Sequence, residues 1–133
     1  MTKRPMIAVD GVLIRDRKIL LVRRGKDPFK GYYALPGGFV EYGETVENAV
    51  VREVLEETGI KTRVKELLGV YSDPNRDPRG HVISIAFLLE YVEGEPRGGD
   101  DAEKAQWFDL EDLPNLAFDH DKIIRDARRR LGV

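Results

Sequence analysis

Three carboxylates and an arginine are grouped at short spacing near the middle of the chain. The run REVLEE contains Arg52, Glu53, Glu56 and Glu57. At about 100° per helical residue, Glu57 would lie about 40° from Glu53, and Glu56 about 60° to the other side. Such carboxylates repel one another unless a cation lies among them, and their oxygens suit hard divalent ions such as Mg²⁺ or Mn²⁺. The alternative is a solvated acidic face in which Arg52 pairs with Glu56 at i,i+4.

The residues around this run carry the start and stop signals of a helix. Thr45 is a typical N-cap residue, and Gly59 is the residue type expected just past a helix C-terminus. Between them, Val51, Val54 and Leu55 point away from the glutamates and are expected to pack on a core. We therefore expect a helix that buries one side and presents its carboxylates on the other.

The longer stretch 38–60 has a pattern of fixed positions. It consists of Gly38, five residues, Glu44, seven residues, Arg52-Glu53, an aliphatic residue, any residue, Glu56-Glu57, any residue, Gly59 and an aliphatic residue. Every fixed position of the Nudix box is present, so the chain resembles the Nudix hydrolase family. The resemblance implies an α/β (α+β) fold with a mixed β-sheet sandwiched between α-helices. It also implies Mg²⁺-dependent hydrolysis, with Mn²⁺ as a substitute, of a nucleoside diphosphate linked to another group.

The same resemblance implies roles for residues in and beside the box. Glu53, Glu56 and Glu57 would hold the metal, together with the backbone carbonyl of Gly37. Arg52 would orient a box glutamate by ion pairing, and Glu44 would organise the loop as a hydrogen-bond acceptor. Many family members place a further carboxylate just ahead of the strand that contains the tryptophan. Asp100, Asp101 and Glu103 compete for that position here, and Asp101 and Glu103 are the two level candidates. The general base is therefore either a box glutamate or one of these two.

Candidate substrate contacts lie in the loops around the box. Arg23 ends a strand, and Gly38 allows the backbone to approach a phosphate closely. Tyr33 either stacks on a base or packs under its own loop. Arg76 and Arg79, in a loop with two Asp-Pro steps, either pair with phosphate oxygens or belong to a polar surface loop.

A proline about fifteen residues past the box marks the ADP-ribose pyrophosphatase-like subgroup, and Pro74 stands at that distance from Gly59. The resemblance thus implies cleavage of ADP-ribose to AMP and ribose 5-phosphate. One alternative is a pyrophosphohydrolase of nucleoside triphosphates or other nucleoside diphosphate derivatives, which the box cannot distinguish because it contacts the shared diphosphate and metal. Another is a non-catalytic ADP-ribose sensor, against which the intact box argues.

Composition sets the outer limits of the interpretation. The chain has 133 residues, of which 41% are hydrophobic and 35% charged, and residues 1–133 are expected to form one domain. A formal net charge of −2 gives no basic excess for DNA or an acidic membrane. The absence of cysteine excludes a thiolate nucleophile. No apolar run of transmembrane length and no signal-peptide pattern is found, so we expect a cytoplasmic protein. The subgroup resemblance favours a homodimer.

The remaining elements follow from hydrophobic patterning. Strands are expected at 5–14 and 18–24, forming a hairpin, and at 61–71, 81–92 and 105–110. A C-terminal helix is expected over 119–131, with Asp119 as its cap and a stripe of core residues at Ile123, Ile124, Ala127 and Leu131.

Overall fold

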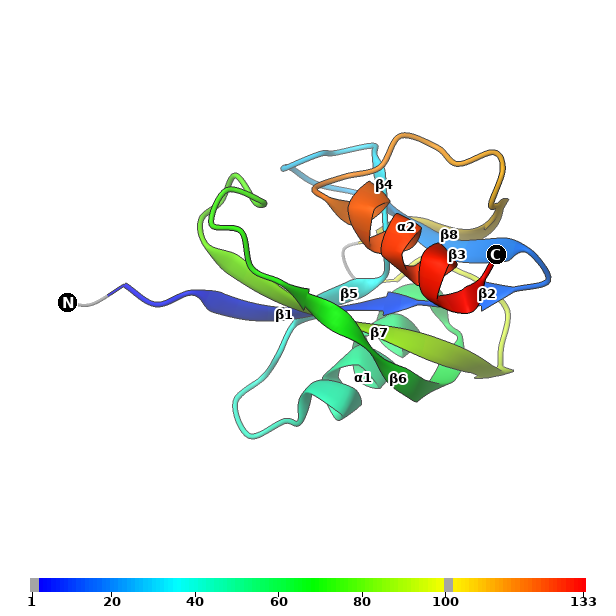
Figure 1. The fold of residues 1–133 in the computed structure, drawn as a ribbon, viewed down its shortest axis with the longest axis horizontal. Helices are drawn as coiled ribbons and strands as arrows, with labels where there is room; N and C mark the ends of the chain where they lie inside the picture. The colour runs from blue at the N-terminus through cyan, green and yellow to red at the C-terminus, as the bar shows by residue number, and fades with distance from the viewer. Residues whose placement is uncertain (1–2, 100–101) are drawn as a thin grey trace.

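The computed structural model describes residues 3–99 and 102–133, and its first sheet lies at the centre of the molecule (Figure 1). This sheet has the order β5-β1-β7-β6, formed by Gly37–Phe39, Met6–Val12, Val82–Glu93 and Lys61–Tyr71. Strands β1 and β7 are parallel, whereas β1 with β5 and β6 with β7 are antiparallel. The sheet is therefore mixed, as the family resemblance implies.

The second sheet contains β2 (Ile14–Arg15), β3 (Lys18–Arg24) and β4 (Tyr33–Ala34), and β8 (Ala102–Asp109) pairs with β3. The predicted hairpin forms where Ile14 pairs with Ile19. Asp16 and Arg17 have φ of 52° and 60°, as a two-residue hairpin turn requires. The predicted strand 5–14 is nevertheless divided at Leu13, so β1 and β2 belong to different sheets.

Helix α1 (Val46–Thr58) has the predicted ends. The Thr45 hydroxyl accepts a hydrogen bond from the Asn48 N–H, and Gly59 adopts the left-handed conformation with φ of 75°. The predicted core face was wrong at Leu55, whose surface is 44% exposed. The buried side is centred on Val50 and Val54 instead, because Leu55 is turned about 100° further around the helix, beyond the area that the sheet covers.

The two helices cover opposite faces of the first sheet (Figure 1). On one face, Val50 and Val54 of α1 belong to the same core cluster as Val9 of β1. On the other face, Ile123 of α2 (His120–Leu131) shares a cluster with Val12 of β1. Because side chains alternate along a strand, Asp10 points to the same face as Val12, toward α2.

Helix α2 confirms the predicted core stripe, since Ile123, Ile124 and Ala127 are buried and Leu131 packs against them. Asp119 occupies the predicted N-cap position of this helix, but its side chain makes no capping hydrogen bond. Its carboxylate binds Arg76 instead. Within the described ranges, no helix is long and apolar enough to cross a membrane.

Candidate active site

A cleft of about 510 Å³ is lined by charged side chains of both signs. The acidic residues come from β1, α1, the loop between β5 and α1, and the loop before β7: Asp10, Glu53, Glu57, Glu41 and Asp77. The basic residues come from the end of β3, the loop that follows it and the loop before β7: Arg23, Arg24, Lys26, Arg76 and Arg79. Carboxylates and guanidinium groups in one cleft suit an anionic ligand that binds together with a cation.

Two box glutamates meet the Gly37–Gly38 segment of β5 at the edge of this cleft. The Gly37 N–H donates a 2.8 Å hydrogen bond to Oε1 of Glu57. The carboxylate of Glu53 lies so close to Gly38 that a Cβ on this residue would collide with it. A Cβ on Gly37 would likewise collide with the Val9 carbonyl oxygen. Glycine is therefore required at both positions for β5 to lie beside both α1 and β1.

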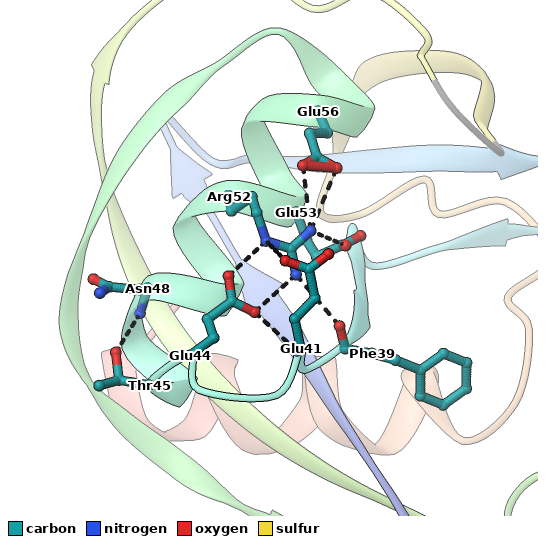
Figure 2. A network of polar contacts seen from close by, with 8 residues as sticks. All are labelled: Phe39, Glu41, Glu44, Thr45, Asn48, Arg52, Glu53 and Glu56. Carbon is teal, nitrogen blue, oxygen red and sulfur yellow. Dashed lines mark hydrogen bonds and ion pairs between the residues drawn. The ribbon is translucent and has the colours of Figure 1, made fainter.

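Arg52 organises the other side of the box (Figure 2). Its Nε and Nη2 bind the two carboxylate oxygens of Glu44 at 2.6 and 2.9 Å. Its Nη1 binds Glu53 Oε1 at 2.6 Å and Glu56 Oε1 at 3.2 Å. Its Nη2 also donates to the Phe39 carbonyl oxygen. One planar guanidinium thus ties the box loop, β5 and α1 together, as the expected orienting role requires.

The same network shifts the pKa values of its members. Hydrogen bonds from Arg52 and from the Glu41 N–H lower the pKa of Glu44 to about 2. Hydrogen bonding to Glu44 in turn raises the pKa of Arg52 above its ordinary value. Glu44 therefore acts as the loop-organising acceptor that the sequence predicts, and it is ionised at neutral pH.

The donor chemistry of the site fits a hard divalent cation. Glu53 and Glu57 bring carboxylate oxygens beside the backbone of Gly37, whereas Glu56 is turned toward Arg52. Within the described residues, no group of three or more His, Cys, Asp or Glu side chains is arranged so that it alone could hold a metal ion. Mg²⁺ is commonly bound by one or two carboxylates plus substrate phosphates and waters, so two convergent glutamates are an appropriate donor set.

The two arginines of the 72–80 loop have different environments. Arg76 has a side chain only 4% exposed and forms a bidentate ion pair with Asp119 at 2.7 and 3.0 Å. Arg79 is 42% exposed and binds the buried carboxylate of Asp77 at 2.8 Å. Its guanidinium lies 5.5 Å from the ring centroids of both Phe39 and Phe118. Although burial acts to raise it, hydrogen bonds from Arg79 lower the pKa of Asp77 below its ordinary value.

Of the other predicted site residues, some line the cleft and some do not. Arg23 lines the cleft and forms a 3.5 Å ion pair with Glu103. Gly38 lines the cleft as well. Tyr33 packs edge-on against Phe108, with ring centroids 4.8 Å apart, which is the packing alternative. Asp101 lies outside the described residues.

The sequence analysis missed Asp10 and His120, which both line the cleft. Asp10 sits in the middle of an aliphatic strand, and His120 opens an amphipathic helix. Each is a single polar residue without a recognisable spacing to others. The register of β1 with β5 pairs Asp10 with Gly37, and the docking of α2 brings His120 to the same place. Because Asp10 and His120 come together only when β1, β5 and α2 pack, their spacing in the sequence could not predict that they are neighbours.

Comparison with known proteins identifies the class. The NUDIX domain matches residues 4–127. A relative from Methanocaldococcus jannaschii, named ADP-ribose pyrophosphatase, is 64% identical over 125 residues, covering 94% of this chain and 74% of the relative. With its mixed sheet between two helices and its intact box, this chain belongs to the Nudix hydrolase family.

Solved structures add two ligand-bound comparisons. The NUDIX domain of Shewanella oneidensis NrtR complexed with ADP ribose superposes with a TM-score of 0.87, at 31% identity, covering 98% of this chain and 90% of that one. A bifunctional NMN adenylyltransferase/ADP ribose pyrophosphatase from Francisella tularensis, complexed with AMP and a manganese ion, gives 0.85 at 29% identity, covering 97% and 42%.

Proposed function

We propose that this protein hydrolyses ADP-ribose to AMP and ribose 5-phosphate, using Mg²⁺ or Mn²⁺. The observation that carries the proposal is the convergence of Glu53 and Glu57 on Gly37 and Gly38 of β5, in a cleft that also contains Arg23 and Arg79. The 64% identical relative named ADP-ribose pyrophosphatase supports this choice of substrate. A homodimer, a cytoplasmic location and a single domain over 1–133 are further proposals that follow from the sequence analysis.

Different residues of the cleft take different roles in the proposed reaction. Glu53 and Glu57, with the Gly37 carbonyl, would hold the divalent cation, which would neutralise diphosphate charge and lower the pKa of a bound water. Glu56, which is turned toward Arg52 in this structure, would join them by leaving that ion pair. Arg52 fixes the orientation of Glu53 through the 2.6 Å contact. Arg23 and Arg79 supply positive charge for phosphate oxygens. A box carboxylate, Glu103 or Asp101 accepts the proton of the attacking water.

Product analysis tests the proposal. Purified protein is incubated with ADP-ribose and Mg²⁺, or with EDTA, and the products are separated by chromatography. Metal-dependent formation of AMP and ribose 5-phosphate is expected. Pyrophosphate release from nucleoside triphosphates, with ADP-ribose left intact, would favour the pyrophosphohydrolase alternative. Binding of ADP-ribose without cleavage would favour the sensor.

Two glutamine variants on the same helix sharpen this test. Glu57→Gln should lower kcat/KM about a hundredfold or more, because it removes a carboxylate from the reaction centre. Glu47→Gln makes the same chemical change at an exposed position in the first turn of α1 and should retain wild-type activity. Equal activity of the two variants at saturating Mg²⁺ would contradict the assignment of Glu57.

A further inference from the structure

A buried polar cluster lies in the wall of the cleft, on the face of the first sheet that α2 covers. It combines Asp10 from β1, Ser84 from β7 and His120 from α2, which are 7%, 0% and 4% exposed. Asp10 and His120 also line the cleft. Burying three polar side chains costs free energy unless they are hydrogen-bonded, so their individual partners indicate what the cluster can bind.

His120 is held in one tautomer. The Leu35 N–H donates a 3.0 Å hydrogen bond to Nδ1 of His120, so Nδ1 accepts and carries no proton. The ring is therefore neutral, with its proton on Nε2. Burial lowers the pKa of His120, which favours the same neutral form. The Nε2–H is thus a hydrogen-bond donor at neutral pH.

Asp10 presents an acceptor beside this donor. One carboxylate oxygen, Oδ2, accepts a hydrogen bond from the Ser84 hydroxyl. The other, Oδ1, lies 2.6 Å from the position that a Cβ on Gly37 would take. It is 3.7 Å from Nε2 of His120, too far for a hydrogen bond between the two atoms. Donor and acceptor therefore lie close together without satisfying each other.

A single hydroxyl group fits this pair. Its oxygen can accept from Nε2–H and its proton can be donated to Oδ1, with both contacts at roughly 2.8 Å across the 3.7 Å gap. We propose that His120 and Asp10 together bind a vicinal hydroxyl of a ribose in the substrate. This inference rests on the proposed function and specifies which part of the nucleotide the cluster recognises.

The position of the pair favours a ribose over the adenine. Asp10 is the register partner of Gly37, the residue whose N–H binds Glu57 at the proposed diphosphate site. In ADP-ribose, a ribose is joined to each end of the diphosphate by one methylene group, whereas the adenine lies beyond its ribose. A group bound next to the diphosphate is therefore a sugar hydroxyl. The adenine amino group, which could also donate to Asp10, is the alternative that the experiment must exclude.

The test measures binding of the two products by calorimetry in the presence of Mg²⁺. AMP and ribose 5-phosphate are each compared with their 2-deoxy and 3-deoxy counterparts. Loss of the bridging hydroxyl should weaken binding about ten- to hundredfold in one of these comparisons, because a charged acceptor loses its donor. Inosine monophosphate is compared with AMP to detect recognition of the amino group.

Three variants assign the effect to Asp10. Asp10→Asn should remove most of the hydroxyl preference, because Ser84 holds the amide oxygen and the amide nitrogen then replaces the acceptor. Asp126→Asn changes a carboxylate that binds Tyr71 outside the cleft, and it should keep the preference. If Asp10→Asn does not fold, Ser84→Ala, which releases Oδ2, should reduce the preference in its place.

The outcomes are separable from those of the proposed function. Equal binding of all deoxy counterparts by the wild-type protein would overturn this inference, and that comparison requires no variant. An unchanged preference in Asp10→Asn, or an Asp10-dependent preference for AMP over inosine monophosphate, would overturn it too. Product binding requires no turnover, so a protein that shows the hydroxyl preference without cleaving ADP-ribose would contradict only the proposed function.

Discussion

Arg76 and Asp119 form a bidentate ion pair that joins the 72–80 loop to the start of α2. The contacts measure 3.0 Å from Nε to Oδ2 and 2.7 Å from Nη2 to Oδ1. Nη1 also donates to the Val82 carbonyl oxygen at 3.4 Å. All three contacts hold the Arg76 side chain within the protein. The loop that carries Arg79 and the helix that carries His120 are thereby fixed relative to each other.

Arg76→Ala should destabilise the protein by about 3 kcal/mol, because it leaves the partly buried Asp119 carboxylate without its guanidinium partner. Urea unfolding measures this loss. Arg79→Lys is the contrasting variant, since it keeps a positive charge beside Asp77. It should raise KM for the nucleotide while unfolding near the wild-type midpoint, because a lysine cannot reproduce the planar contacts. Equal unfolding midpoints for both variants would contradict a structural role for Arg76.

Gly38→Ala should lower kcat/KM about a hundredfold, because its new Cβ would displace the Glu53 carboxylate from its position beside β5. Gly69→Ala is the matched control. A Cβ there meets the Tyr71 ring at 3.7 Å, an ordinary van der Waals contact, outside the cleft. Steady-state kinetics on both variants checks the difference. Wild-type turnover by Gly38→Ala would show that the position of Glu53 is unimportant.

Added Mg²⁺ should raise the melting temperature, because the cation binds the folded arrangement of Glu53 and Glu57 in preference to the unfolded chain. At a concentration of one hundred times Kd, the expected stabilisation is about 2.7 kcal/mol. EDTA should reverse the shift. Glu57→Gln should reduce it strongly and Glu47→Gln should preserve it, so calorimetry reports on the site without turnover. A shift of equal size in both variants would place the cation elsewhere.

Acid should weaken the box through Glu44. The pKa of Glu44 is about 2 in the folded protein, against an ordinary value of 4.5 that applies to the unfolded chain. The ionised carboxylate therefore makes its full contribution to stability above pH 4.5. That contribution is lost as the pH falls from about 4.5 toward 2. The melting temperature of the wild-type protein should therefore exceed that of Glu44→Gln at pH 6, and the two should converge near pH 2. A constant difference over this range would be inconsistent with the Glu44–Arg52 pairing.

The sequence predicted the box helix correctly because the residues that start and end it act on neighbours within a few positions. Thr45 and Gly59 end the helix by contacts within a few residues, and Arg52 reaches Glu56 one turn away. Resemblance to the family supplied the mixed sheet between helices, whereas the metal-binding role of the Gly37 carbonyl stays a prediction. These features depend on residue type and spacing, which the sequence displays directly.

The remaining features depend on contacts between distant segments. Arg76 bonds to Asp119, 43 residues away, and this pairing overrides the expected capping role of Asp119. Leu55 is exposed because the sheet covers a narrower arc of α1 than the hydrophobic residues occupy. His120 reaches Leu35 across 85 residues. None of these partners can be chosen from local patterning, because the choice is made when the elements pack.

The contacts of Arg52 have an evolutionary consequence. Its guanidinium lies within 4 Å of carboxylate oxygens from Glu41, Glu44, Glu53 and Glu56. A lysine could not meet all four, because its ammonium is a single point of charge. Loss of the guanidinium in one mutational step would leave several acidic groups of the box with reduced charge compensation. A substitution at position 52 that keeps the box intact would therefore require compensating changes at several of its partners beforehand.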